Sequence, residues 1–125
     1  MSTTTLPNAS GHYISLQTAI AMTGLFRSNR EVILAELYQE RDILPLSETF
    51  HRDAIDELLG VPGCAGIRIY PGMDEDDKLH SILVAVNEDN EDILSLSVAR
   101  NNEPVIIEVG QRCPPTCPPA SDLNT

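Results

Sequence analysis

Apolar residues recur at three- and four-residue steps through residues 15–41, which is the spacing of one face of an α-helix. Gly24 and the Ser28-Asn29 pair lie inside this stretch. They could end one helix and cap a second, or be tolerated within one long helix. We favour a single long helix that bends there. Pro45 disfavours helical backbone at Leu44, so the chain is expected to turn at that point.

A second helix is predicted from about Ser47 to Leu59, where apolar residues again share one stripe. Ser47 or Thr49 can cap its first turn with a side-chain oxygen. Gly60 is placed as a left-handed terminator, and Pro62 follows to prevent the helix from continuing.

Beyond the second helix the apolar period shortens to about two, which indicates β-strands. The predicted strands are a short one around Ile67 and Ile69 bounded by Gly66 and Pro71-Gly72, then residues 79–86, 93–98 and 105–109, with a polar turn at 87–92. Residues 79–86 are the most apolar and are expected to be central. Because helices precede strands, the order predicts an α+β fold: a long amino-terminal helix and a second helix packed on an antiparallel sheet of about four strands.

The length of 125 residues fits one ordinary domain. We divide the chain into a flexible amino terminus (1–13), a single α+β domain (14–110) and a proline- and cysteine-rich tail (111–125).

The charge balance restricts the partners. Lys and Arg number 8 against 19 Asp and Glu, a formal net charge of −11. Binding to nucleic acid or to an anionic membrane surface needs a basic face, so neither is expected. Residues 74–92 hold eight of the acids against one lysine, which is typical of solvated hairpin ends. Because arginines lie on the first helical stretch, the net charge does not exclude binding of a small anionic ligand or of a protein partner.

The amino terminus lacks the basic start and apolar run of a secretory signal. The longest uninterrupted apolar run, residues 82–86, is far shorter than the ~20 residues that span a bilayer. We therefore expect a cytoplasmic protein in which Cys64, Cys113 and Cys117 are reduced, and the odd cysteine count agrees with that expectation.

The most unusual local motif is Cys113-Pro-Pro-Thr-Cys117. Two thiols at this spacing could hold a soft metal such as Cu(I) or Zn(II), or cycle between dithiol and disulfide. Neither further ligands at a metal-site spacing nor a helix amino terminus accompanies them. Cys113 and Cys117 are thus candidate ligands to which no metal is assigned, no cofactor is predicted, and the tail could instead be a polyproline-like strap.

Four residues near the predicted helix-to-sheet junction have catalytic potential: His51, Cys64, Arg68 and Tyr70. A Cys–His nucleophilic pair is possible if the fold brings the two side chains together. The ordinary alternative is a packed thiol, an exposed histidine, and an arginine and tyrosine on one face of a strand. No complete set of nucleophile, base and orienting group can be assembled, so none of the four is assigned as catalytic.

The chain resembles a family of small bacterial proteins of unknown function. The resemblance lies in residues 15–31, in residues 50–70 with the segment GCAGIRIY, in residues 79–94 and in the CPPTCPP tail. It implies a bacterial, soluble, single-domain protein whose tail belongs to the domain. It carries over no catalytic residue.

Two classes of function follow. We favour a non-enzymatic binding or interaction module that self-associates into a homo-oligomer. The alternative is a thiol-dependent enzyme or a soft-metal or redox protein that uses Cys64 or the Cys113/Cys117 pair.

Overall fold

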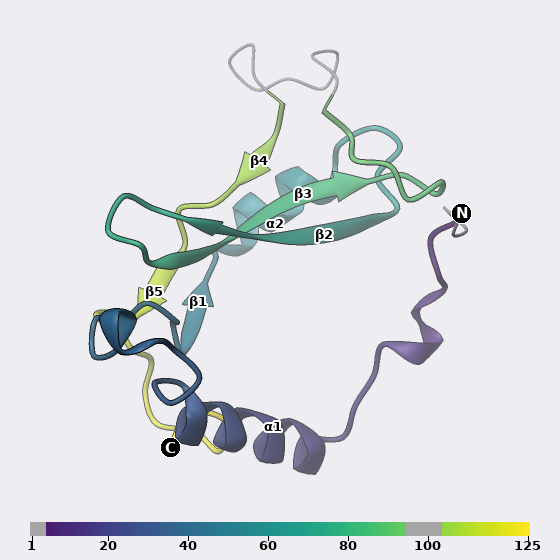
Figure 1. The fold of residues 1–125 in the computed structure, drawn as a ribbon. Helices are drawn as coiled ribbons and strands as arrows, with labels where there is room; N and C mark the ends of the chain where they lie inside the picture. The colour runs from purple at the N-terminus through teal and green to yellow at the C-terminus, as the bar shows by residue number, and fades with distance from the viewer. Residues whose placement is uncertain (1–4, 95–103) are drawn as a thin grey trace.

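The computed structural model describes residues 5–94 and 104–125, and its fold is α+β as predicted (Figure 1). The helices are α1 (Leu16–Asn29) and α2 (Arg52–Leu59), and two short 3-10 turns cover Ala9–Gly11 and Glu36–Tyr38. The strands are β1 (Ser47–Thr49), β2 (Gly66–Met73), β3 (Leu79–Val86), β4 (Ile106–Ile107) and β5 (Gln111–Cys113).

The strands form two antiparallel sheets instead of one sheet of about four strands. One sheet has the order β2-β3-β4, so residues 79–86 are central as expected, and the other pairs β1 with β5. The core lies on β3 beneath α2. Its buried members are Leu58, Val61, Leu83 and Ala85, and Leu58 and Ala85 are wholly inaccessible to solvent.

Strand β2 continues through Pro71 and Gly72, where the sequence predicted an end. The Ile93 N–H donates to the Ala85 carbonyl at 2.9 Å, so the backbone groups of Ala85 point away from β2. Successive residues of a strand direct their N–H and C=O groups to opposite sides, and the pairing register therefore places the backbone groups of Pro71 on the side away from β3 as well. Its missing N–H costs no hydrogen bond between β2 and β3.

The prediction of one long helix through residue 41 is wrong, because α1 ends at Asn29. The Ser28 hydroxyl and the Asn29 side-chain amide donate to the carbonyls of Gly24 and Leu25, at 3.1 and 2.9 Å. These bonds from a side chain to the carbonyl four residues earlier supplement the backbone bonds of the last helical turns. Arg30 then donates to the Leu44 carbonyl at 2.5 Å, which holds the returning chain against the end of the helix.

The second helix starts at Arg52, later than predicted, because residues 47–49 pair with β5. Neither Ser47 nor Thr49 caps the helix. His51 does, since its Nδ1 accepts the Asp53 N–H at 3.0 Å. Gly60 ends the helix as expected, but with right-handed backbone (φ −80°) where a left-handed conformation was predicted.

Two further strands differ from the sequence pattern. Residues 95–98 of the predicted strand 93–98 lie outside the described residues, and Asp92 forms an isolated antiparallel bridge with Val86. The predicted strand 105–109 is reduced to β4, Ile106–Ile107. The predicted tail begins at residue 111 with β5, in which Arg112 and Cys113 are buried, so the start of the tail is part of the fold.

Two cross-strand neighbours in the smaller sheet, Glu48 and Arg112, connect it to the larger one. Glu48 Oε1 accepts the Ser81 N–H at 2.7 Å, and Arg112 Nε donates to the Leu79 carbonyl at 3.1 Å. Their side chains thus occupy the place of a further strand beside the first half of β3.

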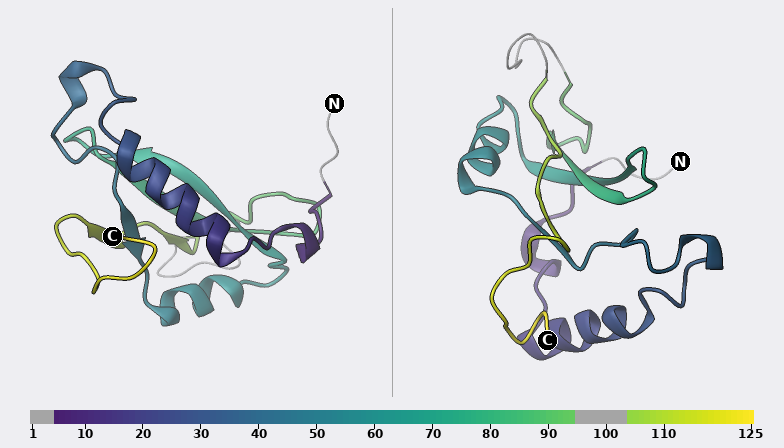
Figure 2. Two further views of the ribbon diagram at one scale, coloured as in Figure 1. Left: turned by 90° about the horizontal axis from the view of Figure 1, so that it is seen from below. Right: turned by 90° about the vertical axis from the view of Figure 1, so that its left-hand side faces the viewer.

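Helix α1 lies apart from the sheets, beside the carboxyl-terminal tail (Figures 1 and 2). The Arg27 guanidinium donates to the carbonyls of Leu123 and Thr125, at 2.7 and 3.0 Å, and so ties the helix to the tail. Among the described residues no helix has the length and apolarity needed to cross a membrane.

Candidate interaction surfaces

Of the four residues with predicted catalytic potential, the fold brings Arg68 and Tyr70 together, on Asp92. Arg68 pairs with one oxygen of the Asp92 carboxylate, and the Tyr70 hydroxyl donates to the other at 2.5 Å. These hydrogen bonds raise the pKa values of both the Arg68 guanidinium and the Tyr70 phenol above their ordinary values. Arg68 also donates to the Asn90 carbonyl at 2.9 Å. The cluster therefore fastens the turn at 87–92 to β2 with a protonated tyrosine, which cannot act as a base near neutral pH.

His51 and Cys64 stand at opposite ends of α2. His51 is exposed and its Nδ1 is engaged by the Asp53 N–H, whereas the Cys64 thiol donates to the Gly66 carbonyl at 3.3 Å. Eight helical residues separate them, which is about 12 Å of helix. The structure does not place the two residues as a Cys–His pair.

The expectation that all three cysteines are reduced is wrong for two of them, because Cys113 and Cys117 form a disulfide. The turn after β5, closed by the Thr116 N–H on the Arg112 carbonyl at 3.0 Å, brings their Cα atoms to 4.6 Å, within the usual range for a disulfide. The odd cysteine is Cys64, which remains free. In this state the paired sulfurs are not available as thiolate ligands.

A second polar cluster, which the sequence did not reveal, surrounds His80. Its Nε2 lies 2.6 Å from Asp74 Oδ2 and its Nδ1 lies 2.9 Å from Glu108 Oε1. Hydrogen bonds from His80 and from the amides of Lys78 and Asp76 lower the pKa of Asp74 to about 2. The cluster joins the β2–β3 hairpin to the chain after β4. Asp74 and His80 flank a predicted hairpin turn, but Glu108 is distant in sequence, so the sequence pattern indicates only two of the three members.

No group of three or more His, Cys, Asp or Glu in the described ranges is arranged to hold a metal ion.

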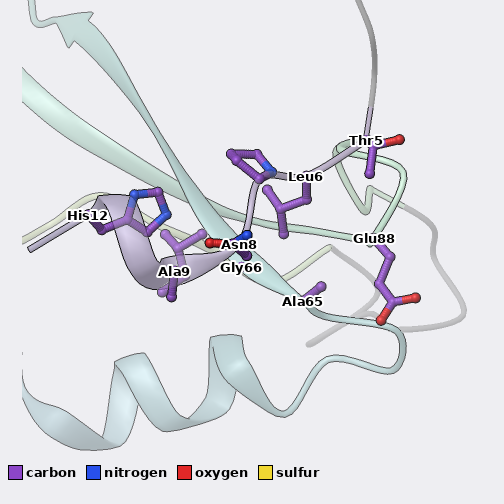
Figure 3. Close-up of a pocket in the computed structure, with 10 residues that line it drawn as sticks. Thr5, Leu6, Asn8, Ala9, His12, Ala65, Gly66 and Glu88 are labelled. Carbon is purple, nitrogen blue, oxygen red and sulfur yellow. The ribbon is translucent and has the colours of Figure 1, made fainter.

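A cavity of about 590 Å³ separates the amino-terminal segment from the start of β2 (Figure 3). The Leu6 N–H donates to the Glu88 carbonyl at 3.0 Å, and the Leu6 side chain lies where a Cβ on Gly66 would come within 3.3 Å. Figure 3 shows His12 and Glu88 on opposite sides of this cavity. The lining therefore offers an apolar surface on which the amino-terminal segment packs, and no adjacent acid–base pair.

Helix α1 is apolar on two faces. The inward face carries Phe26, which with Leu46 and Leu123 lines a small cavity of about 180 Å³ against the tail. The exposed side of the helix, here called the outer face of α1, consists of Thr18, Ala21, Met22 and Leu25, of which Met22 also borders this cavity. Met22 is 60% and Leu25 is 67% exposed. An apolar stripe on a helix normally packs against another element, so the outer face of α1 is a surface of the described structure that favours a covering partner.

Comparison with protein-family models, with curated proteins and with solved structures found no match to this chain. The resemblance to a family of small bacterial proteins accordingly stays a prediction.

Proposed function

We propose that this protein is a non-enzymatic interaction module that self-associates through the outer face of α1. The observation that carries the proposal is the exposure of Met22 and Leu25 on a helix whose other face is already packed against the tail. Burying one such side chain from water contributes about 1.5–3 kcal/mol, so covering several of them favours association.

The exposed area of the whole chain agrees with one missing interface. A compact monomer of 13.7 kDa exposes about 6,600 Å², whereas this chain exposes 8912 Å². Even if the thirteen residues outside the described ranges are allotted the area of an unfolded chain, roughly 2,000 Å², the remainder exceeds a compact protein of its mass by about 700 Å². A standard interface buries about 800 Å² on each partner.

The distribution of charge favours a second copy of this chain as the partner. All 19 Asp and Glu residues follow Arg30, so residues 1–30 contain no acid. The outer face of α1 carries no charged side chain. Two copies that meet there avoid the repulsion that a net charge of −11 would cause at their other surfaces.

The alternative, thiol or soft-metal chemistry, has less support. The Cys64 thiol is not paired with His51, and the Cys113/Cys117 sulfurs are bonded to each other. A dithiol–disulfide cycle would include this disulfide as one of its states, but the turn that holds it supplies no helix amino terminus to activate a thiolate.

Cytoplasmic localisation and a bacterial origin remain predictions. The Cys113–Cys117 disulfide weighs against the cytoplasm, because reducing compartments rarely preserve such bonds.

The test is the molar mass in solution, measured by light scattering after gel filtration. The wild-type chain is expected at twice 13.7 kDa, about 27 kDa, and the Leu25→Glu variant at 13.7 kDa. Val109→Glu is the matched control, because Val109 is 92% exposed and lies outside α1, and it should keep the wild-type mass. A Leu25→Glu variant that keeps the dimer mass would refute the proposed surface.

A further inference from the structure

The two edges of the β2–β3 pair differ in how their backbone groups are satisfied. The edge of β3 that faces away from β2 is covered along its length. Ile43 and Glu48 accept the N–H groups of Leu79 and Ser81, at 2.8 and 2.7 Å. Beyond them Leu83 pairs with β4, and the Ala85 carbonyl accepts the Ile93 N–H.

The outer edge of β2 is open. Because backbone direction alternates, the N–H and C=O groups of Ile67, Ile69 and Met73 point away from β3, as does the Pro71 carbonyl. Within residues 5–94 and 104–125 these groups have no backbone partner, and β2 is the terminal strand of its sheet (Figure 1). The side chains of Ile69 and Met73 are 62% and 60% exposed. An edge of this kind is a template for a further strand.

Acidic turns flank both ends of this edge. Residues 74–77 follow β2 directly, and residues 87–92 lie beside its start because Val86 faces Gly66. Asp74, Asp77 and Asp92 are already paired with His80, Arg41 and Arg68. The described structure gives no ion pair to five exposed carboxylates in these turns: Glu75, Asp76, Glu88, Asp89 and Glu91.

We propose that the outer edge of β2 binds an extended peptide segment of another protein, with apolar or β-branched residues in its centre and Lys or Arg at both ends. The central residues would pair with Ile67 and Ile69, and the basic ends would reach the two acidic turns. Charge complementarity selects this partner over a second copy, because antiparallel pairing of two β2 strands would place acidic turns side by side. The inference does not rest on self-association through α1.

The span sets the length of the probe. Seven residue steps from Gly66 to Met73 cover about 24 Å, so an eight-residue peptide reaches from one turn to the other. The probe is Lys-Val-Thr-Val-Thr-Val-Thr-Lys, acetylated and amidated, titrated to about 1 mM into the full chain at low salt. Its counterpart has Glu at both ends.

Amide hydrogen exchange measured by NMR tests directly whether a peptide covers the outer edge of β2. Peptide binding should slow exchange at Ile67 and Ile69 about tenfold or more, while Arg68 and Tyr70, whose amides face β3, serve as internal controls and should not change. The Glu-ended peptide should bind at least about tenfold more weakly. N-methylation of one alternate set of peptide amides should abolish binding, and methylation of the other set should leave it intact.

A matched pair of protein variants tests the charges. Glu75→Gln with Glu88→Gln should weaken binding of the basic peptide about threefold for each charge removed. Asp122→Asn removes an exposed acid from the carboxyl-terminal tail beside α1, away from β2, and should have no effect. The proposal is overturned if the basic peptide does not bind up to about 1 mM. It is equally overturned if both peptides bind alike, or if both methylation patterns are tolerated.

Discussion

Arg112 is the side chain whose removal should most weaken the connection between the two sheets. It is 9% exposed, and its guanidinium donates to the carbonyls of Leu79, Asp42 and Ile43 at 3.1, 2.8 and 2.8 Å. The substitution Arg112→Met keeps most of the apolar stem and deletes all three donors.

The size of the effect follows from those three bonds. A hydrogen bond to a charged group contributes about 1.5–3 kcal/mol. Because the variant no longer buries a charge, the desolvation cost of the guanidinium disappears and offsets part of the lost hydrogen-bond energy. We therefore expect the free energy of unfolding to fall by about 3 kcal/mol. With a slope near 1.5 kcal/mol per molar urea, the midpoint should move down by about 2 M.

The assay is urea unfolding followed by circular dichroism, at one fixed protein concentration because self-association also contributes to stability. Arg52→Met is the control. Arg52 makes an exposed pair with Asp56 on the surface of α2, and its loss should leave the midpoint almost unchanged. If Arg112→Met unfolds at the same urea concentration as Arg52→Met, then the three carbonyls do not depend on Arg112 and the proposed connection between the sheets is wrong.

Three further predictions follow from particular side chains. The pKa of Asp74 is lowered from 3.8 to about 2, so its contribution to stability is present above pH 4 and lost as the pH falls towards 2. Asp74→Asn should flatten that part of a stability–pH curve, and an unchanged curve would contradict the His80 cluster. The native, unreduced chain should titrate one thiol, Cys64, and three after reduction in denaturant, so three thiols before reduction would contradict the disulfide. In a spectrophotometric titration the pKa of Tyr70 should lie above the ordinary value of 10.0, because its hydroxyl donates to Asp92, and Tyr70→Phe should remove that ionisation.

The sequence pattern located elements whose partners are close along the chain. The apolar run at residues 79–86 became β3 with the predicted bounds, because five consecutive apolar residues flanked by polar turns favour a central strand. The polar segment after it forms the expected turn, and Gly60 ends α2. Local spacing is sufficient information for such features.

Elements that depend on distant contacts escaped prediction. Ser47–Thr49 has the residues of a helix start, but it forms a strand because Gln111–Cys113 lies beside it. The Cys113–Cys117 disulfide differs from the reduced state that the lack of a secretory signal predicts, because the turn after β5 brings the two sulfurs together. The alternation of residues along the strand predicts that Arg68 and Tyr70 share one face. Asp92 lies in a turn that the sequence predicts to be solvated, and only the fold places that turn against β2.

Sedimentation equilibrium of the unmodified chain tests self-association most directly. Over a series of protein concentrations the molar mass should approach about 27 kDa, twice the chain mass of 13.7 kDa, as the concentration rises. The Leu25→Glu variant should sediment as a monomer throughout, with the same helix content by circular dichroism. A wild-type chain that remains at 13.7 kDa up to about 0.5 mM would contradict self-association through α1, since covering a standard interface should produce a dimer well below that concentration.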